Sequence, residues 1–184
     1  MKATGIVRRI DELGRVVIPK EIRRTLRIRE GDPLEIYTDH DGEVVLKKYS
    51  PIGEIASIAK DYTDSLYRSL GHVALISDRD MIVSCSGTTR KDLMDKGLSG
   101  DIERLMAQRQ IVRLNAADGA RMLMITPEDD AAAYSAQIVA PILSDGDVIG
   151  SLILLSRENG VRMTDIDQKV AETTAGIVGR QMEQ

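Results

Sequence analysis

The chain of 184 residues has no tryptophan, no phenylalanine and five tyrosines, so its core must be built mainly from aliphatic residues and methionine. Proteins that read single-stranded nucleic acid stack the bases on aromatic rings, and the shortage of such rings argues against that function. The single cysteine, Cys85, excludes an intrachain disulfide and fits a reducing compartment. No apolar run approaches the roughly 18 residues of a membrane helix, and no signal-peptide core is present, so we expect a cytoplasmic protein.

Familiar catalytic and metal-binding motifs are also missing from the sequence. There is no glycine-rich phosphate loop, no Cys-x-x-Cys and no His-Glu-x-x-His, and His40 and His72 are isolated. Cys85 lies in an apolar stretch, which is typical of a buried thiol rather than a nucleophile. The acidic run 128–130 is more typical of a solvated loop than of a cation site. We therefore predict no catalytic residue, no metal and no cofactor, and a protein that is not an enzyme.

The charge of the chain is distributed unevenly. Residues 1–29 contain nine Lys or Arg against three Asp or Glu, a net charge of +6, whereas the chain as a whole carries −4. A concentrated cationic segment on an acidic protein indicates that a polyanion binds this segment. Eight of these nine cations lie within 22 positions: Arg8, Arg9, Arg15, Lys20, Arg23, Arg24, Arg27 and Arg29.

The first fifty residues predict a small unit of four short strands and one helix. The strands are expected over 4–10, 15–18, 34–37 and 44–46, with a helix over 20–26 after Pro19 and a hairpin turn at 39–42. A unit of this size rarely holds together without a disulfide, a metal or a partner subunit. One cysteine in the whole chain and one histidine in this segment cannot build a zinc site. We infer an obligate dimer in which the partner's strands complete the core.

Pro51 marks a boundary after which the pattern changes. Residues 51–55 are expected to form a linker and the start of a helix, and residues 56–184 a second domain with a mixed sheet and helices. Its predicted elements are a helix over 52–70, strands over 72–76, 81–85, 111–114 and 121–125, a helix over 100–110, a hairpin over 137–143 and 148–155, and a last helix after a capping box of Thr164 and Asp167.

The first and last helices of this second domain carry apolar residues at spacings of three and four. That spacing is typical of a coiled-coil seam, and equally of one amphipathic helix packing on its own domain. The two helices are expected to pack as a pair or as a four-helix bundle across a dimer. The residues in question are Ile52, Ile55, Ala59, Tyr62 and Leu66 in the first helix, and Met163, Ile166, Val170, Thr173 and Ile177 in the last.

The segment 4–26, with its core Asp11-Glu12-Leu13-Gly14-Arg15-Val16-Val17-Ile18-Pro19, closely resembles the AbrB-type swapped-hairpin transcription regulators. Segments 31–36 and 46–49 extend the resemblance. It implies an interlocked β-barrel dimer that binds double-stranded DNA. In that family the arginines that match Arg8, Arg15, Arg23 and Arg24 face DNA. We add Arg9 and Lys20 as further candidates. The alternative is a solvated charged face whose cations form intrachain ion pairs with Asp11, Glu12 and Glu21.

The run from Ala140 to Leu152 resembles the late hairpin of GAF domains, which are antiparallel sheets flanked by helices. The two resemblances together imply an α+β protein of two domains, a regulator that activates or represses sporulation genes. The second domain is then expected to tetramerise the protein. It either binds a small-molecule effector, with candidate walls in 84–87 and 123–133, or has a collapsed pocket. The alternative function is an antitoxin, which shares the swapped-hairpin head but typically has a short disordered tail to wrap its toxin.

Overall fold

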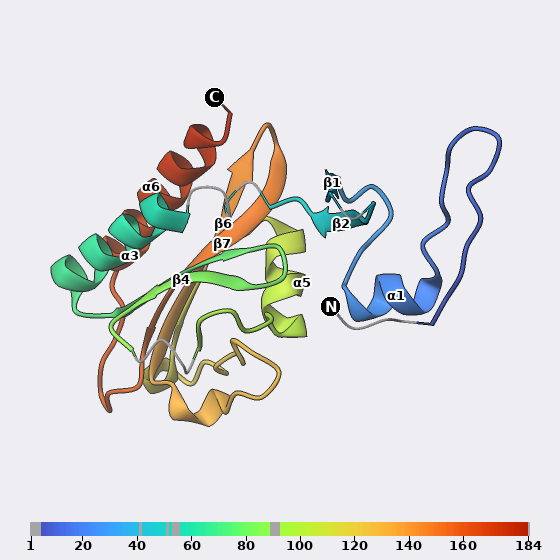
Figure 1. The fold of residues 1–184 in the computed structure, drawn as a ribbon. Coiled ribbons are helices and arrows are strands. Elements are labelled where there is room, and N and C mark those ends of the chain that lie inside the picture. The colour runs from blue at the N-terminus through green and yellow to red at the C-terminus, as the bar shows by residue number, and fades with distance from the viewer. Residues whose placement is uncertain (1–4, 41, 51, 53–55, 89–92, 184) are drawn as a thin grey trace. The chain divides into compact units, whose positions relative to one another are not determined.

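The structure is a computed structural model that describes residues 5–40, 42–50, 52, 56–88 and 93–183. The chain divides into two compact units, residues 1–49 and residues 50–184, which we call the N-terminal unit and the C-terminal unit (Figure 1). The predicted linker residues 51 and 53–55 lie outside the described part of the chain, as do Thr4 and Asp41. Across the described ranges, no helix is long and apolar enough to cross a membrane.

The regular elements of the N-terminal unit are α1 (Lys20–Thr25), β1 (Leu34–Thr38) and β2 (Val44–Lys48). Pro19 caps the start of α1 with a φ of −58°, a value that already suits a helix and needs no backbone donor. The two strands form an antiparallel hairpin in which Ile36 lies opposite Leu46. These three elements confirm the helix and the hairpin expected from the sequence.

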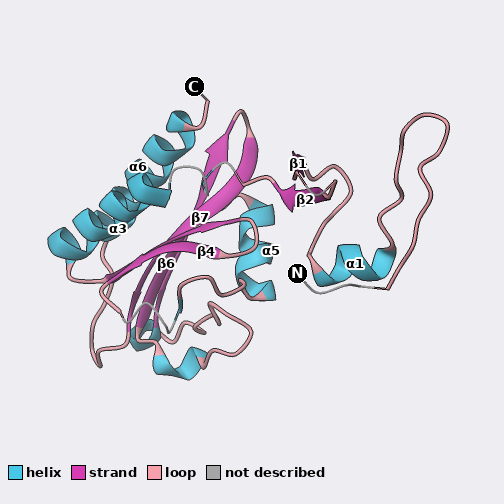
Figure 2. Cartoon of the chain, in the orientation of Figure 1, coloured by secondary structure: helices cyan, strands magenta, loops and turns pink. Residues whose placement is uncertain are grey.

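The two strands predicted over 4–10 and 15–18 are not formed within the single chain. The described residues 5–18 run as two extended arms with no strand pairing, joined by a tight turn (Figure 2). In the turn, the Asp11 amide donates to the Arg15 carbonyl at 3.1 Å, and the Gly14 amide donates to the Asp11 carbonyl at 3.0 Å. A swapped hairpin finds its strand partners in a second chain, which accounts for arms that remain unpaired in one copy.

The C-terminal unit is built on a five-stranded antiparallel sheet in the order β4-β3-β7-β6-β5. Its strands are β3 (Val73–Asp78), β4 (Ile82–Ser86), β5 (Val112–Asn115), β6 (Ala136–Ser144) and β7 (Asp147–Ser156). Its α-helices are α3 (Ala56–Leu70), α5 (Gly100–Gln108) and α6 (Asp165–Gln181), with short 3-10 turns at Ala116–Asp118 and Ala131–Ala133. Helices α3 and α6 cover one face of the sheet, and α5 covers the other (Figure 1).

Alternate residues of the central strands pack in two separate hydrophobic cores, one on each face of the sheet. Leu152 and Leu154 pack with α3 and α6, whereas Ile153 and Leu155 pack with α5 on the opposite face. Successive side chains of a strand point to opposite faces, so a strand covered on both sides reads as an unbroken apolar run. The run in β7 therefore reflects a sheet that is buried on both faces.

Helix α6 is fixed at both ends. At its start, Thr164 and Asp167 form the predicted capping box, in which the Thr164 amide donates to the Asp167 carboxylate at 2.7 Å. Near its end, a Cβ atom built on Gly179 would lie 1.9 Å from the Leu143 carbonyl oxygen. The glycine therefore lets the helix backbone approach β6 more closely than any other residue would allow.

The prediction of a strand over 121–125 is wrong. The segment is irregular, and its backbone pairs with a side chain instead of a neighbouring strand. Gln137, which is fully buried in β6, accepts from the Leu123 amide and donates to the Leu123 carbonyl, both at 2.8 Å. A side-chain amide offers the same donor and acceptor as a peptide group, so it replaces a strand partner at this point.

The apolar seams of α3 and α6 differ in how far their side chains are buried. In α3, Ala59 and Leu66 are buried against the unit's own sheet, which is the outcome of an ordinary amphipathic helix. In α6, Ile166 is 72% exposed and Ile177 is 44% exposed, although both belong to a seam with the same spacing. The side chain of Ile55 lies outside the described residues.

Candidate nucleic-acid interface

The structure places all six candidate DNA contacts on the surface of the N-terminal unit. Three lie on the extended arms and their turn, and three lie on α1, and every one of them is exposed. On α1, the apolar side is marked by the half-buried Ile22, while Arg23 and Arg24 occupy the last turn. The six residues are Arg8, Arg9, Arg15, Lys20, Arg23 and Arg24.

The turn between the arms is organised by one carboxylate. Asp11 accepts hydrogen bonds from the Leu13 amide at 3.0 Å, the Arg15 amide at 2.8 Å and the Arg15 Nε at 2.8 Å. The hydrogen bonds from the Arg15 amide and side chain hold the pKa of Asp11 below its ordinary value. An aspartate three residues before a glycine is a known turn signal, and the sequence predicted both the turn and Asp11 as an ion-pair partner of the nearby cations. The structure confirms that ion pair for Arg15.

A second group of contacts ties the end of α1 to the hairpin. Arg27 has a φ of 51°, and its carbonyl accepts from Lys48 Nζ of β2 at 3.0 Å. The same Nζ lies 3.0 Å from Asp32, whose carboxylate also accepts from the Arg29 amide at 2.8 Å. Burial alone would raise the pKa of Asp32, but the Arg29 hydrogen bond and the Lys48 ion pair bring it below its ordinary value. Arg27 and Arg29 therefore lie at a structural junction.

The N-terminal unit leaves its apolar residues in solvent. Val7 is 86% exposed, Val17 72% and Ile36 69%. Among the described residues of this unit, Pro19 is the one that is buried. Exposed apolar area on this scale marks an interface, as expected of the dimer core inferred from the sequence.

The titratable groups singled out in the C-terminal unit have structural partners. Cys85 is buried, and His72 Nε2 lies 3.7 Å from Asp167. Asp129 does not face solvent as expected of its acidic run. It accepts from the Tyr134 hydroxyl at 2.5 Å, and burial together with this hydrogen bond raises the pKa of Tyr134 to about 12. Within the described ranges, no group of three or more potential metal ligands comes together.

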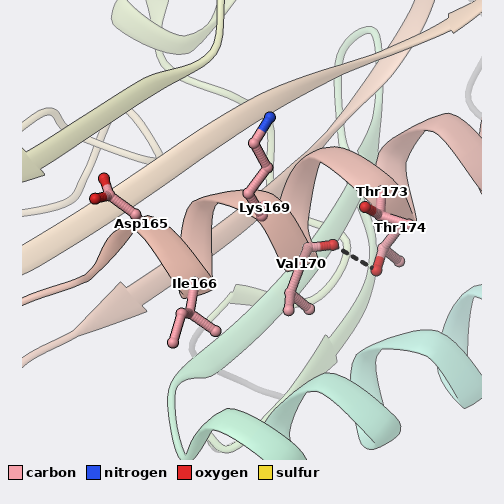
Figure 3. A pocket seen from close by; sticks show the side chains of 6 residues that line it. All are labelled: Asp165, Ile166, Lys169, Val170, Thr173 and Thr174. Carbon is pink, nitrogen blue, oxygen red and sulfur yellow. Dashed lines mark hydrogen bonds between the residues drawn. The ribbon is translucent and has the colours of Figure 1, made fainter.

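The expected walls of an effector pocket are occupied by packing and hydrogen bonds. Ser84 and Ser86 bond to Thr63 of α3 at 2.9 and 3.0 Å, and Ile125 is fully buried in the core beneath α5. A described hollow lies elsewhere, along α6. It is a groove of about 430 Å³ lined by Asp165, Ile166, Lys169, Val170, Thr173 and Thr174. Figure 3 shows Ile166 and Val170 projecting from the same side of the helix.

Comparison with known proteins finds a matching family for each of the two units. Residues 54–183 match the family described as stage V sporulation protein T C-terminal, transcription factor, and residues 7–54 match the family described as antidote-toxin recognition MazE, bacterial antitoxin. Stage V sporulation protein T of Bacillus subtilis is 53% identical over 184 residues, which is all of both chains. The transition state regulatory protein AbrB of the same organism is 69% identical over 51 residues, 28% of this chain and 52% of its own length.

Solved structures show the fold of the C-terminal unit. The GAF domain of an Acinetobacter phosphoenolpyruvate-protein phosphotransferase superposes with a TM-score of 0.58 at 14% identity, covering 74% of this chain and 84% of that one. The antitoxin-type match is confined to the head, whereas the likeness to a sporulation transcription factor spans the whole length, so the antitoxin interpretation is not favoured. The head is similar in sequence to the transition state regulatory protein AbrB. The chain thus belongs to the stage V sporulation protein T family of transcription factors.

Proposed function

We propose that residues 1–50, as an interlocked dimer, hold double-stranded DNA with Arg8, Arg9, Arg15, Lys20, Arg23 and Arg24. The observation that carries the proposal is that all six side chains are exposed on one small unit whose first 29 residues have a net charge of +6. A dimer presents this set twice. The partner is then duplex DNA, and the protein is expected in the cytoplasm on the nucleoid.

Arginine suits both tasks that duplex recognition requires. Its planar fork binds two phosphate oxygens, or O6 and N7 of a guanine in the major groove. Phosphate contacts position a protein on the duplex, and base contacts specify the site. Neighbouring arginines such as Arg23 and Arg24, on the last turn of a short exposed helix, are placed to divide these roles.

The first test is binding of a fluorescent random-sequence duplex over a salt series. If about eight phosphates are neutralised, the slope of log affinity against log salt should be near −7. In the dimer, Arg23→Ala with Arg24→Ala removes four cations, so the slope should become less steep by up to about 4. The matched control, Arg104→Ala with Arg121→Ala, removes the same charge from exposed positions of the C-terminal unit. Equal binding by the head variant and the control would overturn the assignment.

The domain over residues 56–184, within the C-terminal unit, is proposed to regulate and to oligomerise rather than to catalyse. The exposed apolar side chains Ile166 and Ile177 of α6 are suited to cover the same helix of a second copy, which would join two head dimers into a tetramer. Linking two heads raises the effective concentration of the second at its DNA site. The residues that fill the face beneath α5 favour this scaffold role over binding of a small-molecule effector.

The oligomer proposal is tested by light scattering after size exclusion. Ile166→Glu with Ile177→Glu should halve the mass of the assembly while the N-terminal dimer persists. Met81→Glu, which charges another exposed apolar residue of the C-terminal unit, is the control and should leave the mass unchanged. An effector is tested separately by a metabolite screen. A compound that shifts both the melting temperature and the DNA affinity would restore the sensing role.

A further inference from the structure

An acidic side chain sits in the middle of the most basic segment of the chain. Asp11 lies between Arg9 and Arg15 in the sequence, at the start of the turn, and its side chain is 40% exposed. A carboxylate on a surface that faces phosphates repels them and lowers affinity for any DNA. Its presence at this position calls for a compensating role.

The geometry of the turn supplies such a role. Oδ1 of Asp11 is held by two backbone amides, those of Leu13 at 3.0 Å and Arg15 at 2.8 Å, so the carboxylate cannot rotate freely. Oδ2 then accepts from Arg15 Nε at 2.8 Å. The backbone fixes the carboxylate, and the carboxylate fixes the plane of the guanidinium.

The contact uses the edge of the guanidinium that DNA needs least. A guanidinium has five N–H donors, and the hydrogen bond to Asp11 engages the one on Nε. The donors on Nη1 and Nη2 form the fork that binds guanine or a pair of phosphate oxygens. The Arg15 side chain is 71% exposed, so this fork remains accessible to a ligand.

We propose that Asp11 is a positioning residue for DNA binding, which sets the direction in which Arg15 presents its Nη1 and Nη2 fork to the duplex. The inference rests on the proposed function, because it takes Arg15 as a DNA contact. The pair then has two opposing effects on DNA binding. Asp11 weakens attraction to any phosphate backbone, and in exchange a pre-oriented Arg15 discriminates better between sequences. Holding a side chain in its bound geometry reduces the entropy lost on binding.

The test uses full-length protein and two duplexes: a random-sequence duplex, and the duplex that wild type enriches best from a randomised pool. Asp11→Asn keeps an oxygen for the two amides but removes the charge and the Nε acceptor. We expect the ratio of affinities for the selected and random duplexes to fall about tenfold. Affinity for the random duplex should stay the same or rise.

A double-mutant cycle with Arg15→Ala separates positioning from other effects. If Asp11 acts through Arg15, then Asp11→Asn should not change the affinity ratio in the Arg15→Ala background. An equal fall in both backgrounds would mean that Asp11 only shapes the turn. An equal gain for both duplexes in the single variant would mean that Asp11 only repels phosphate. Either result overturns the proposal.

A measurement without DNA tests the pair itself. The Arg15 Nε–H resonance should exchange slowly with solvent in the wild type and fast in Asp11→Asn, and circular dichroism should show that the variant is folded. Fast exchange in the wild type would overturn the proposal. If the wild type binds neither duplex, the proposed function fails and the positioning role fails with it, whereas slow exchange would still show that Asp11 holds Arg15.

Discussion

The two units of this chain bury apolar residues to very different extents. In the C-terminal unit, Leu152, Ile153 and Leu154 are fully buried in two cores on opposite faces of one sheet. In the N-terminal unit, Ile36, Val17 and Val7 lie in solvent, and Pro19 is the one buried residue among those described. One unit is complete within a single chain. The other presents half of a core, and its sequence can be understood only together with a second copy.

The difference between the two units is tested most directly by placing a charge on the exposed apolar face of the hairpin. Ile36 is 69% exposed, and a surface substitution in a lone chain changes stability by no more than about 0.5 kcal/mol. If the face is the dimer core, Ile36→Lys buries an unpaired charge. We expect loss of the head dimer and at least a roughly tenfold loss of affinity for random-sequence duplex, measured by sedimentation and fluorescence anisotropy.

Tyr37→Lys is the control for that variant, because Tyr37 is 45% exposed and points to the opposite face of β1. It should retain the dimer. Wild-type assembly and affinity in Ile36→Lys would show that the face is simply solvated and that the N-terminal unit is stable without a partner.

A matched pair of leucine truncations should separate the two kinds of core. Leu154→Ala removes a fully buried side chain and should destabilise the C-terminal unit by about 3 kcal/mol. This loss should be the same at any protein concentration. Leu46→Ala acts on a side chain that is 41% exposed in one chain, and its effect should depend on protein concentration because the core it serves is shared. Urea unfolding at two concentrations checks both, and a concentration-independent loss in Leu46→Ala would contradict the shared core.

A smaller effect is expected at the start of α6. Thr164→Ala removes the capping box and should cost about 1 kcal/mol in the C-terminal unit alone. Thr164→Ser, which retains the hydroxyl, should restore most of the loss. Urea unfolding monitored in each unit gives the measurement. An equal loss in the N-terminal unit would indicate that the two units unfold together.

The smallest effect concerns the pH dependence of the N-terminal unit. The pKa of Asp32 is lower in the folded unit than in the unfolded chain, where it is about 3.9. The ionised carboxylate therefore stabilises the folded unit above about pH 3.9, and this stabilisation is lost as the pH falls through the lower pKa of the folded state. Asp32→Asn should flatten this loss of stability below about pH 4. The comparison is thermal melting of wild type and variant between pH 3 and 7. Identical pH profiles would show that the Lys48 ion pair contributes nothing measurable.

Local signals in the sequence predicted local structure well. The turn between β6 and β7 has Asp145 at a φ of 49° and Gly146 at 80°, the backbone that an Asp-Gly hairpin favours. The capping box of Thr164 and Asp167 formed as expected. Each of these features is determined by residues that are adjacent or nearly adjacent in the chain.

The errors arise where a distant partner decides the structure. The strand predicted over 121–125 did not form because Gln137, a residue of another element, replaces its strand partner. The seams of α3 and α6 have the same spacing, yet spacing alone does not say which surface each helix covers. In the candidate site, the charge distribution located the cluster of cations, and the resemblance to AbrB-type regulators selected the arginines expected to face DNA. Their contact with DNA stays a prediction. The role of Asp11 depends on turn geometry, which charge counting does not reveal.

The unfinished core of the N-terminal unit also bears on how the protein is made. Translation proceeds from the N-terminus, so the head leaves the ribosome before the unit that is complete in itself. Since the head needs a second chain to bury Ile36 and its neighbours, we expect the head to remain incompletely folded until two polypeptides associate. The order of synthesis and the order of folding are then reversed. The C-terminal unit, synthesised last, would fold first and hold two nascent heads near each other.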